Sequence, residues 1–215
     1  PRMSARIDIV GVTKTYDGAS AAFTGTATGL GAGINGTLGY DGAVNAGSYD
    51  VGGLWSTQYD ISYTGPSARL TIQPRTVTAT VSGSKTYDGA AYLEQPATYV
   101  FSNLVGGDTL GVSGLVRFSD KNAGTGKTMS VVDPALTNNE LGNYVLGGGI
   151  SGSGSIAKAP LALSGLSVTS RRYDGTVVAR LGGSASVSGV HGDDVALTGV
   201  VGGAATFNNK NVGAH

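Results

Sequence analysis

Lys85-Thr86-Tyr87-Asp88-Gly89 is a short stretch that returns twice more in the sequence in nearly the same form. The other two copies are Lys14-Thr15-Tyr16-Asp17-Gly18 and Arg171-Arg172-Tyr173-Asp174-Gly175. In each copy the aspartate can accept a hydrogen bond from the backbone two residues further on, and the glycine can adopt the positive φ of a tight turn. The tyrosine can lay its ring on an apolar face while its hydroxyl stays in water. We therefore predict one structural turn per copy, formed by Tyr16, Asp17 and Gly18, by Tyr87, Asp88 and Gly89, and by Tyr173, Asp174 and Gly175.

The spacing of the three copies divides the chain into modules. The copies lie 71 and 86 residues apart, and repetition at such a period is typical of tandem folding units. Proline marks a strand end at Pro74 and at Pro160, because proline cannot donate to a β-ladder. We predict three modules, at residues 1–74, 75–160 and 161–215. The third has no counterpart of the last part of the second, so we expect it to be incomplete and the chain to continue on both sides.

The composition favours strands over helices. Glycine provides 37 of the 215 residues, and only 13% of all residues are charged. The glycines do not follow a collagen-like period, so they indicate many turns. Glutamate, a good polar helix former, occurs only twice. Val77, Ala79 and Val81 alternate with threonines in the clearest period-2 pattern of the chain. We predict an all-β chain of small immunoglobulin-like sandwich modules in an elongated array, with a β-grasp and a helix in residues 133–143 as the alternative.

Similar alternation predicts other inward-facing side chains. Ile7 and Ile9 should point into the first module, and Met129 and Val131 into the second. Trp55 falls between two strand-like stretches, and packing of its ring over a thin core is favoured over a role as a ligand platform.

Charge and cysteine content exclude several classes of protein. Lys and Arg balance Asp and Glu at 14 each, so no positive field is available to attract nucleic acid. The absence of cysteine excludes disulfides, thiolate chemistry and zinc ribbons. No apolar run is long enough to span a bilayer, so we expect that this chain is not itself inserted in a membrane.

The second and third modules resemble the YDG repeats that occur in tandem in very large exported bacterial adhesins, such as filamentous-haemagglutinin-like and biofilm-matrix proteins. Besides the Tyr-Asp-Gly turn, the resemblance rests on Gly107-Asp108 and Gly192-Asp193, on Lys121-Asn122-Ala123-Gly124 and Lys210-Asn211-Val212-Gly213, and on Gly142-Asn143-Tyr144. Arg171-Arg172 replaces the usual Lys-Thr or Lys-Val, a change that leaves the turn intact.

The first module has four characteristic stretches, which are Lys14-Thr15-Tyr16-Asp17-Gly18, Gly36-Thr37-Leu38, Ala43-Val44-Asn45-Ala46-Gly47-Ser48-Tyr49 and Tyr59-Asp60-Ile61-Ser62-Tyr63. Through these stretches it resembles the related MBG repeat. Gln58-Tyr59 stands where an Asn-Tyr pair is typical. The two resemblances imply a location outside the cell or on the bacterial surface, and a stalk or presentation role.

The sequence offers no residues for catalysis or for a cofactor. The only histidines are His191, which we expect in an exposed loop, and the terminal His215. Gly-x-Gly stretches lie outside any βαβ context and read as turns. Asp108, Asp193 and Asp194 are acidic loop positions that could hold calcium, but structural turn capping is favoured because carboxylates are sparse. We predict that the protein is not an enzyme and has no metal or cofactor.

Two functions remain open. The first is a structural stalk segment that projects an adhesive domain from the cell, with modules held in a semi-rigid rod by short proline-marked joins. The second is an adhesion module that binds an extracellular polysaccharide or another copy of the adhesin through exposed aromatics, for which the candidates are Tyr40, Tyr59, Tyr63 and Tyr92.

Overall fold

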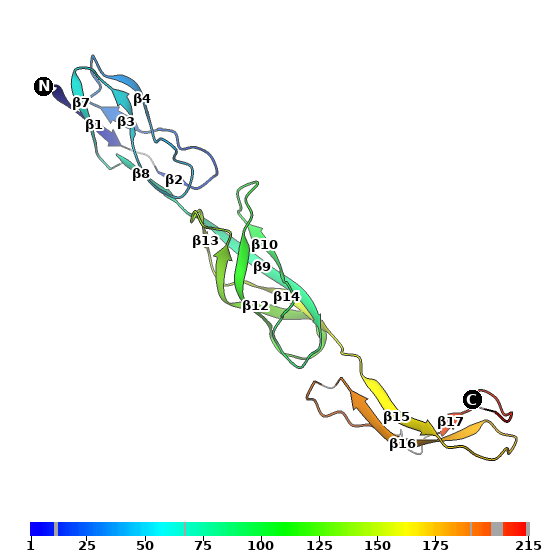
Figure 1. Ribbon diagram of the computed structural model, residues 1–215. Helices are drawn as coiled ribbons and strands as arrows, with labels where there is room; N and C mark the ends of the chain where they lie inside the picture. The colour runs from blue at the N-terminus through cyan, green and yellow to red at the C-terminus, as the bar shows by residue number, and fades with distance from the viewer. Residues whose placement is uncertain (11–12, 67, 190, 199–203, 214–215) are drawn as a thin grey trace. The chain divides into compact units, whose positions relative to one another are not determined.

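The computed structural model describes residues 1–10, 13–66, 68–189, 191–198 and 204–213. Within these residues the chain consists of strands, turns and loops without a helix, which confirms the all-β prediction (Figure 1). None of the described residues forms a helix long and apolar enough to cross a membrane. His215, noted above as one of the two histidines, lies outside the described residues.

The helix that a β-grasp alternative requires is not found in residues 133–143. Residues 133–137 continue strand β12 (Gly124–Thr137) and the rest form a turn. Asp133, just before Pro134, has a positive φ of 49°, and the strand continues past it to Thr137. Alternation of half-buried and exposed side chains continues through this end of the strand, so the segment remains extended.

The chain divides into two compact units, each described here by itself. The first unit comprises Pro1–Ser82, Ala97–Arg117 and Met129–Gly152, and the second comprises Gly83–Pro96, Phe118–Thr128 and Ser153–His215. The division into three modules by sequence remains a prediction, and we use "first, second and third repeat" below for residues 1–74, 75–160 and 161–215.

The first repeat is built on three small sheets. Strand β1 pairs antiparallel with β3 and parallel with β7, β8 pairs parallel with β2 and antiparallel with β5, and β4 pairs antiparallel with β6. The bounds are β1 (Met3–Val10), β2 (Lys14–Thr15), β3 (Thr26–Thr28), β4 (Asn35–Gly39), β5 (Gly47–Asp50), β6 (Gly52–Trp55), β7 (Tyr59–Thr64) and β8 (Arg69–Gln73).

The core of the first repeat lies between β1 and β8. Ile7 and Ile9 from β1 are fully buried, as predicted, and they belong to one cluster with Leu70 and Ile72 from β8. The prediction for Trp55 is wrong, since its side chain is 59% exposed. Trp55 is the last residue of β6, along which half-buried and exposed positions alternate, and it falls on the exposed face of that strand.

The second repeat forms a six-stranded sheet in the order β10-β9-β14-β12-β11, with β13 paired parallel to β9. Val77, Ala79 and Val81 are buried and the neighbouring threonines are exposed, which confirms the alternation on β9. Met129 and Val131 are also buried, as predicted. The bounds are β9 (Arg75–Thr86), β10 (Thr98–Ser102), β11 (Gly111–Phe118), β13 (Tyr144–Leu146) and β14 (Ser151–Ala157).

The third repeat has a three-stranded antiparallel sheet in which β16 (Val178–Ser188) lies between β15 (Ala162–Val168) and β17 (Ala204–Thr206). Ala179 is buried there, while Leu161 and Leu163 are about half exposed. Among the described residues the core of this repeat is therefore thin.

Candidate functional site

The three Tyr-Asp-Gly turns have the same backbone geometry. Gly18, Gly89 and Gly175 have φ angles of 77°, 83° and 77°, in the left-handed region where a Cβ is strained. In each turn an aspartate oxygen accepts the backbone N–H two residues further on. The donors are Ala19 to Asp17 at 2.9 Å, Ala90 to Asp88 at 3.0 Å and Thr176 to Asp174 at 2.9 Å.

A basic residue three positions earlier closes each turn. Lys14 pairs with Asp17 at 2.7 Å, Lys85 pairs with Asp88 at 2.5 Å, and Arg171 pairs with Asp174. The lysine hydrogen bond lowers the pKa of both Asp17 and Asp88, with the turn N–H as the next contribution. Arg171 therefore fills the lysine position, and its guanidinium also lies 5.6 Å from the ring centre of Phe207.

Each of the first two turns is tied to the end of its own repeat. The backbone N–H of Tyr16 donates to the carbonyl of Gln73 at 2.9 Å, and that of Tyr87 donates to the carbonyl of Ala157 at 2.8 Å. Both acceptors are the last residues of strands that precede the next repeat. The tyrosine side chain of each turn consequently lies where one repeat meets the following one.

At the first junction, the Tyr16 hydroxyl reaches an aspartate of the second repeat. Tyr16 Oη donates to Asp108 Oδ2 at 2.8 Å, and Tyr144 Oη donates to the same oxygen at 2.5 Å. The two rings meet edge to face with centroids 5.3 Å apart, a favourable arrangement for aromatic pairs. Both tyrosines are nearly buried, with 5% and 6% of their surface exposed. One carboxylate therefore serves two phenols in a largely dry contact.

The amide of Asn143 adds a second contact to this junction. Its Nδ2 donates to Asn45 Oδ1 at 2.9 Å, and its Oδ1 accepts the Ala46 N–H at 2.7 Å. Arg75 donates from Nη1 to the Tyr16 carbonyl at 3.1 Å. Asn143 is a buried polar residue whose side chain is hydrogen-bonded in this way, so burial of the amide is compensated.

The second junction, within the second unit, uses the same pair of residue types. The Tyr87 hydroxyl donates to Asp193 Oδ2, and Lys121 Nζ pairs with Asp193 Oδ1 at 3.0 Å. The Tyr87 ring meets the His191 ring edge to face at 6.1 Å. These contacts lower the pKa of Asp193, chiefly through the Tyr87 hydroxyl and next through Lys121.

Asp108 and Asp193 occupy the same position in their repeats. Each follows a glycine with a positive φ, which is 94° at Gly107 and 83° at Gly192. Both junctions therefore use an aspartate as the acceptor for the turn tyrosine. The second residue bound to that aspartate is Tyr144 at the first junction and Lys121 at the second. Sequence reasoning used both aspartates as part of the repeat resemblance and considered them for turn capping or calcium, but it did not place them at a junction. Their recurrence at one repeat position was the signal that could have marked them as junction residues.

The predicted aromatic binding surface is only partly exposed. Tyr40 is 4% exposed, so its prediction as an exposed ligand-binding residue is wrong; it packs in the first repeat's core, where its ring lies 6.3 Å from that of Phe23. Tyr59 and Tyr63 are half-buried, and the Tyr63 hydroxyl accepts the Leu54 N–H at 3.2 Å. Tyr92 is exposed.

The first junction is expected to lose stability at high pH, because Tyr144 is buried there. Burial, and after it the hydrogen bond to Asp108, raises the pKa of Tyr144 to about 12, and the same two causes raise that of Tyr16. Because the pKa of Tyr144 is higher in the folded than in the unfolded chain, the protonated phenol stabilises the fold. This stabilisation is fully present below the unfolded pKa of about 10 and is lost as the pH rises through the folded pKa of about 12.

We expect the free energy of unfolding to fall by about 2 kcal/mol between pH 10 and pH 12, as two pKa units correspond to about 2.7 kcal/mol. This fall in the free energy of unfolding is measured by denaturant unfolding at a series of pH values, with tyrosinate absorbance recorded in parallel. Tyr144→Phe should flatten the profile in this window; an unchanged slope in that variant would assign the effect to other groups.

Comparison with known proteins identifies the repeats. The family model of the YDG domain matches residues 71–152 and again residues 157–215, which together make up more than half of the chain. No curated protein and no solved structure matches the chain. Both matched segments contain a Tyr-Asp-Gly turn and a Gly-Asp loop. The chain therefore belongs to the YDG-domain family.

Proposed function

We propose that this chain is a structural stalk segment of a large bacterial cell-surface or biofilm-matrix adhesin, located outside the cell, where it projects an adhesive domain. The observation that supports the proposal is the recurring junction, in which the turn tyrosine of one repeat hydrogen-bonds the aspartate of the next. A stalk needs repeats that hold one another in a fixed orientation, and a contact reused at successive junctions provides this.

The energetics of the junction suit that role. A hydrogen bond to a charged group contributes roughly 1.5–3 kcal/mol, against about 1 kcal/mol for a neutral pair. Tyr16 and Tyr144 both donate to one carboxylate, and Asn143 adds two further hydrogen bonds. Pro74 and Pro160 at the joins restrict the backbone on either side. Together these features resist bending between repeats.

The proposal includes finer assignments. We propose that each repeat is a small immunoglobulin-like sandwich and that the first repeat is of the MBG type. The partners on either side are then further segments of the same long chain. No cofactor or metal enters this function, and a stalk carries no catalytic activity.

Small-angle scattering of the 215-residue chain tests the stalk. A compact protein of this length has a radius of gyration of about 17 Å. We expect a value well above this, with the same profile in calcium and in chelator, because the junction contacts described above are direct hydrogen bonds and ion pairs between protein groups. A radius near the compact value would contradict the stalk.

An adhesion module is the second candidate, favoured by the exposure of Trp55. More than half of the Trp55 surface is exposed, whereas a tryptophan in a protein core is largely covered. An exposed indole can stack on a sugar ring. Trp55 is the only tryptophan, so its fluorescence reports contact directly. Titration with an extracellular polysaccharide or with more of the same chain should shift the emission if this function holds, and Tyr92→Ala would serve as the comparison at a second exposed aromatic.

A further inference from the structure

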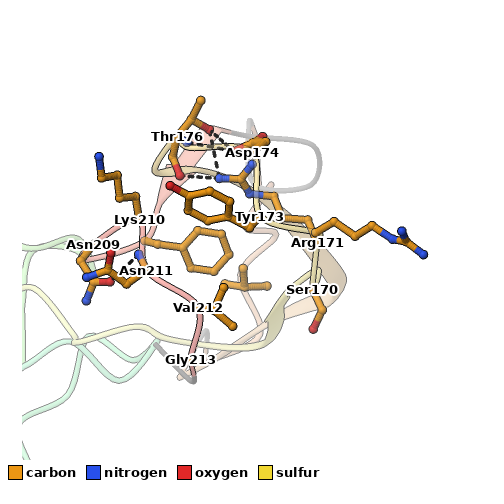
Figure 2. Close-up of a pocket in the computed structure, with 13 residues that line it drawn as sticks. Ser170, Arg171, Tyr173, Asp174, Thr176, Asn209, Lys210, Asn211, Val212 and Gly213 are labelled. Carbon is orange, nitrogen blue, oxygen red and sulfur yellow. Dashed lines mark hydrogen bonds and ion pairs between the residues drawn. The ribbon is translucent and has the colours of Figure 1, made fainter.

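The third repeat carries an open cleft built from the residues that make the second junction. The cleft has a volume of about 440 Å³ and includes Tyr173, Lys210, Asn211 and Val212 in its lining (Figure 2). At the second junction, a cleft of about 380 Å³ is lined by the corresponding Tyr87, Lys121, Asn122 and Ala123. Its wall is completed by Lys158 and Ala159 at the end of the same repeat and by residues of the third repeat that include Gly189 and Asp193. One such cleft is therefore seen with its aspartate loop and one without.

We propose that the cleft around Tyr173 and Lys210 is the docking site for the Gly-Asp loop of a following YDG repeat. The Tyr173 hydroxyl donates to the aspartate of that loop and the Lys210 ammonium forms an ion pair with it. The proposal rests on the proposed stalk function in that it names the partner of the next junction.

The exposure of the turn tyrosines follows their partners. Tyr16, with a loop and a second tyrosine against it, is 5% exposed; Tyr87, with a loop, is half-buried; and Tyr173 is 62% exposed. All three lie in turns of the same geometry. The difference therefore comes from what lies against the ring, and the cleft at Tyr87 is lined both by Asp193 and by Lys158 and Ala159 at the end of the same repeat.

The charge of the cleft selects a carboxylate. Arg171, Arg172 and Lys210 line it, and Asp174 neutralises Arg171. Among the described residues, no carboxylate forms an ion pair with Arg172 or Lys210. At the second junction Lys121, the counterpart of Lys210, is paired with Asp193 at 3.0 Å. An incoming aspartate would supply the matching charge.

The occupant also needs a particular backbone. In both observed junctions the aspartate follows a glycine with φ near +90°, a conformation that other residues adopt only with strain. A Gly-Asp loop therefore presents its carboxylate at an angle that an arbitrary acidic segment does not reproduce. This favours a YDG repeat over an unrelated acidic peptide.

An extended chain tests the proposal. Residues 207–213 parallel residues 118–124 in sequence, so joining residue 213 to a second copy of residues 125–215 completes the third repeat and adds a fourth with its own Asp193. Carbodiimide links a lysine amine to a carboxylate in contact with it, with loss of water. The Lys121–Asp193 link, already in ion-pair contact, is the internal control for folding and reactivity.

We expect a Lys210 link to the copied Asp193 in a yield comparable to the control link and independent of protein concentration. Tyr173→Phe should lower the Lys210 yield several-fold and leave the control link unchanged. A strong control link without the Lys210 link would overturn the proposal, and so would a Lys210 link that grows with concentration, which would indicate a second copy as the occupant.

A second measurement covers the case in which the extended chain does not fold. A peptide of residues 187–197, added to the 215-residue chain, should link to Lys210 more than the same peptide carrying D193N. Equal linking of the two peptides would contradict the docking site. A compact scattering profile would remove the stalk but would leave the Lys210 link, so the two proposals fail separately.

Discussion

Asp108→Ala is expected to lower the free energy of unfolding by about 3 kcal/mol, because it leaves two buried phenols without their acceptor. Tyr16 and Tyr144 both donate to Asp108 Oδ2, and their rings are packed against each other. A buried donor without a partner costs roughly 1–3 kcal/mol. For a chain of this length that corresponds to a fall in Tm of about 6–12 °C. Thermal unfolding followed by circular dichroism provides the measurement.

Asp193→Ala is the matched control. It removes the equivalent carboxylate at the second junction, where Tyr87 is only half-buried and Lys121 is exposed, so water can replace the lost contact. The expected loss is below about 1 kcal/mol. D108N, which keeps one acceptor oxygen, should lose less than D108A. If D108A and D193A lowered the free energy of unfolding equally, burial of the junction would not determine how much its hydrogen bonds stabilise the protein.

Gly152→Ala is expected to destabilise the second repeat by about 3 kcal/mol or more, the upper end for overpacking. A Cβ at Gly152 on β14 would lie 1.8 Å from the carbonyl oxygen of Val81 on the neighbouring strand β9. Real Cβ atoms do not approach backbone so closely, so one strand has to move. β9 cannot shift freely, because Val77 and Val81 are buried in the core.

Gly148→Ala provides the comparison for Gly152→Ala. Gly148 lies nearby in sequence, and nothing lies within 4 Å of the position of its Cβ. The expected change is within about 0.5 kcal/mol, as for other unobstructed surface substitutions. Chemical denaturation of both variants and the parent chain decides the outcome. A Gly152→Ala chain as stable as the Gly148→Ala chain would mean that β9 and β14 lie further apart than described.

Local interactions were readable from the sequence. The Asp-Gly turns depend on a backbone N–H two residues away and on a basic residue three residues away, so the residues that make them stand next to each other in the chain. Strand alternation is equally local, which is why the buried faces around Ile7 and Val77 could be predicted. Short-range hydrogen bonds and the period of the pleat do not depend on the rest of the fold.

Contacts between distant segments were decided by tertiary structure alone. The Tyr16 hydroxyl meets an aspartate 92 positions away, and the Tyr87 hydroxyl meets one 106 positions away. The exposure of Trp55 and the burial of Tyr40 likewise depend on which strands cover them. Residue type and local spacing allow several such partners, and only the packing of whole strands and loops selects one. The sequence therefore determined the repeat and its turns, while the fold determined that the turn tyrosine meets the next repeat, because that contact joins side chains that no local pattern relates.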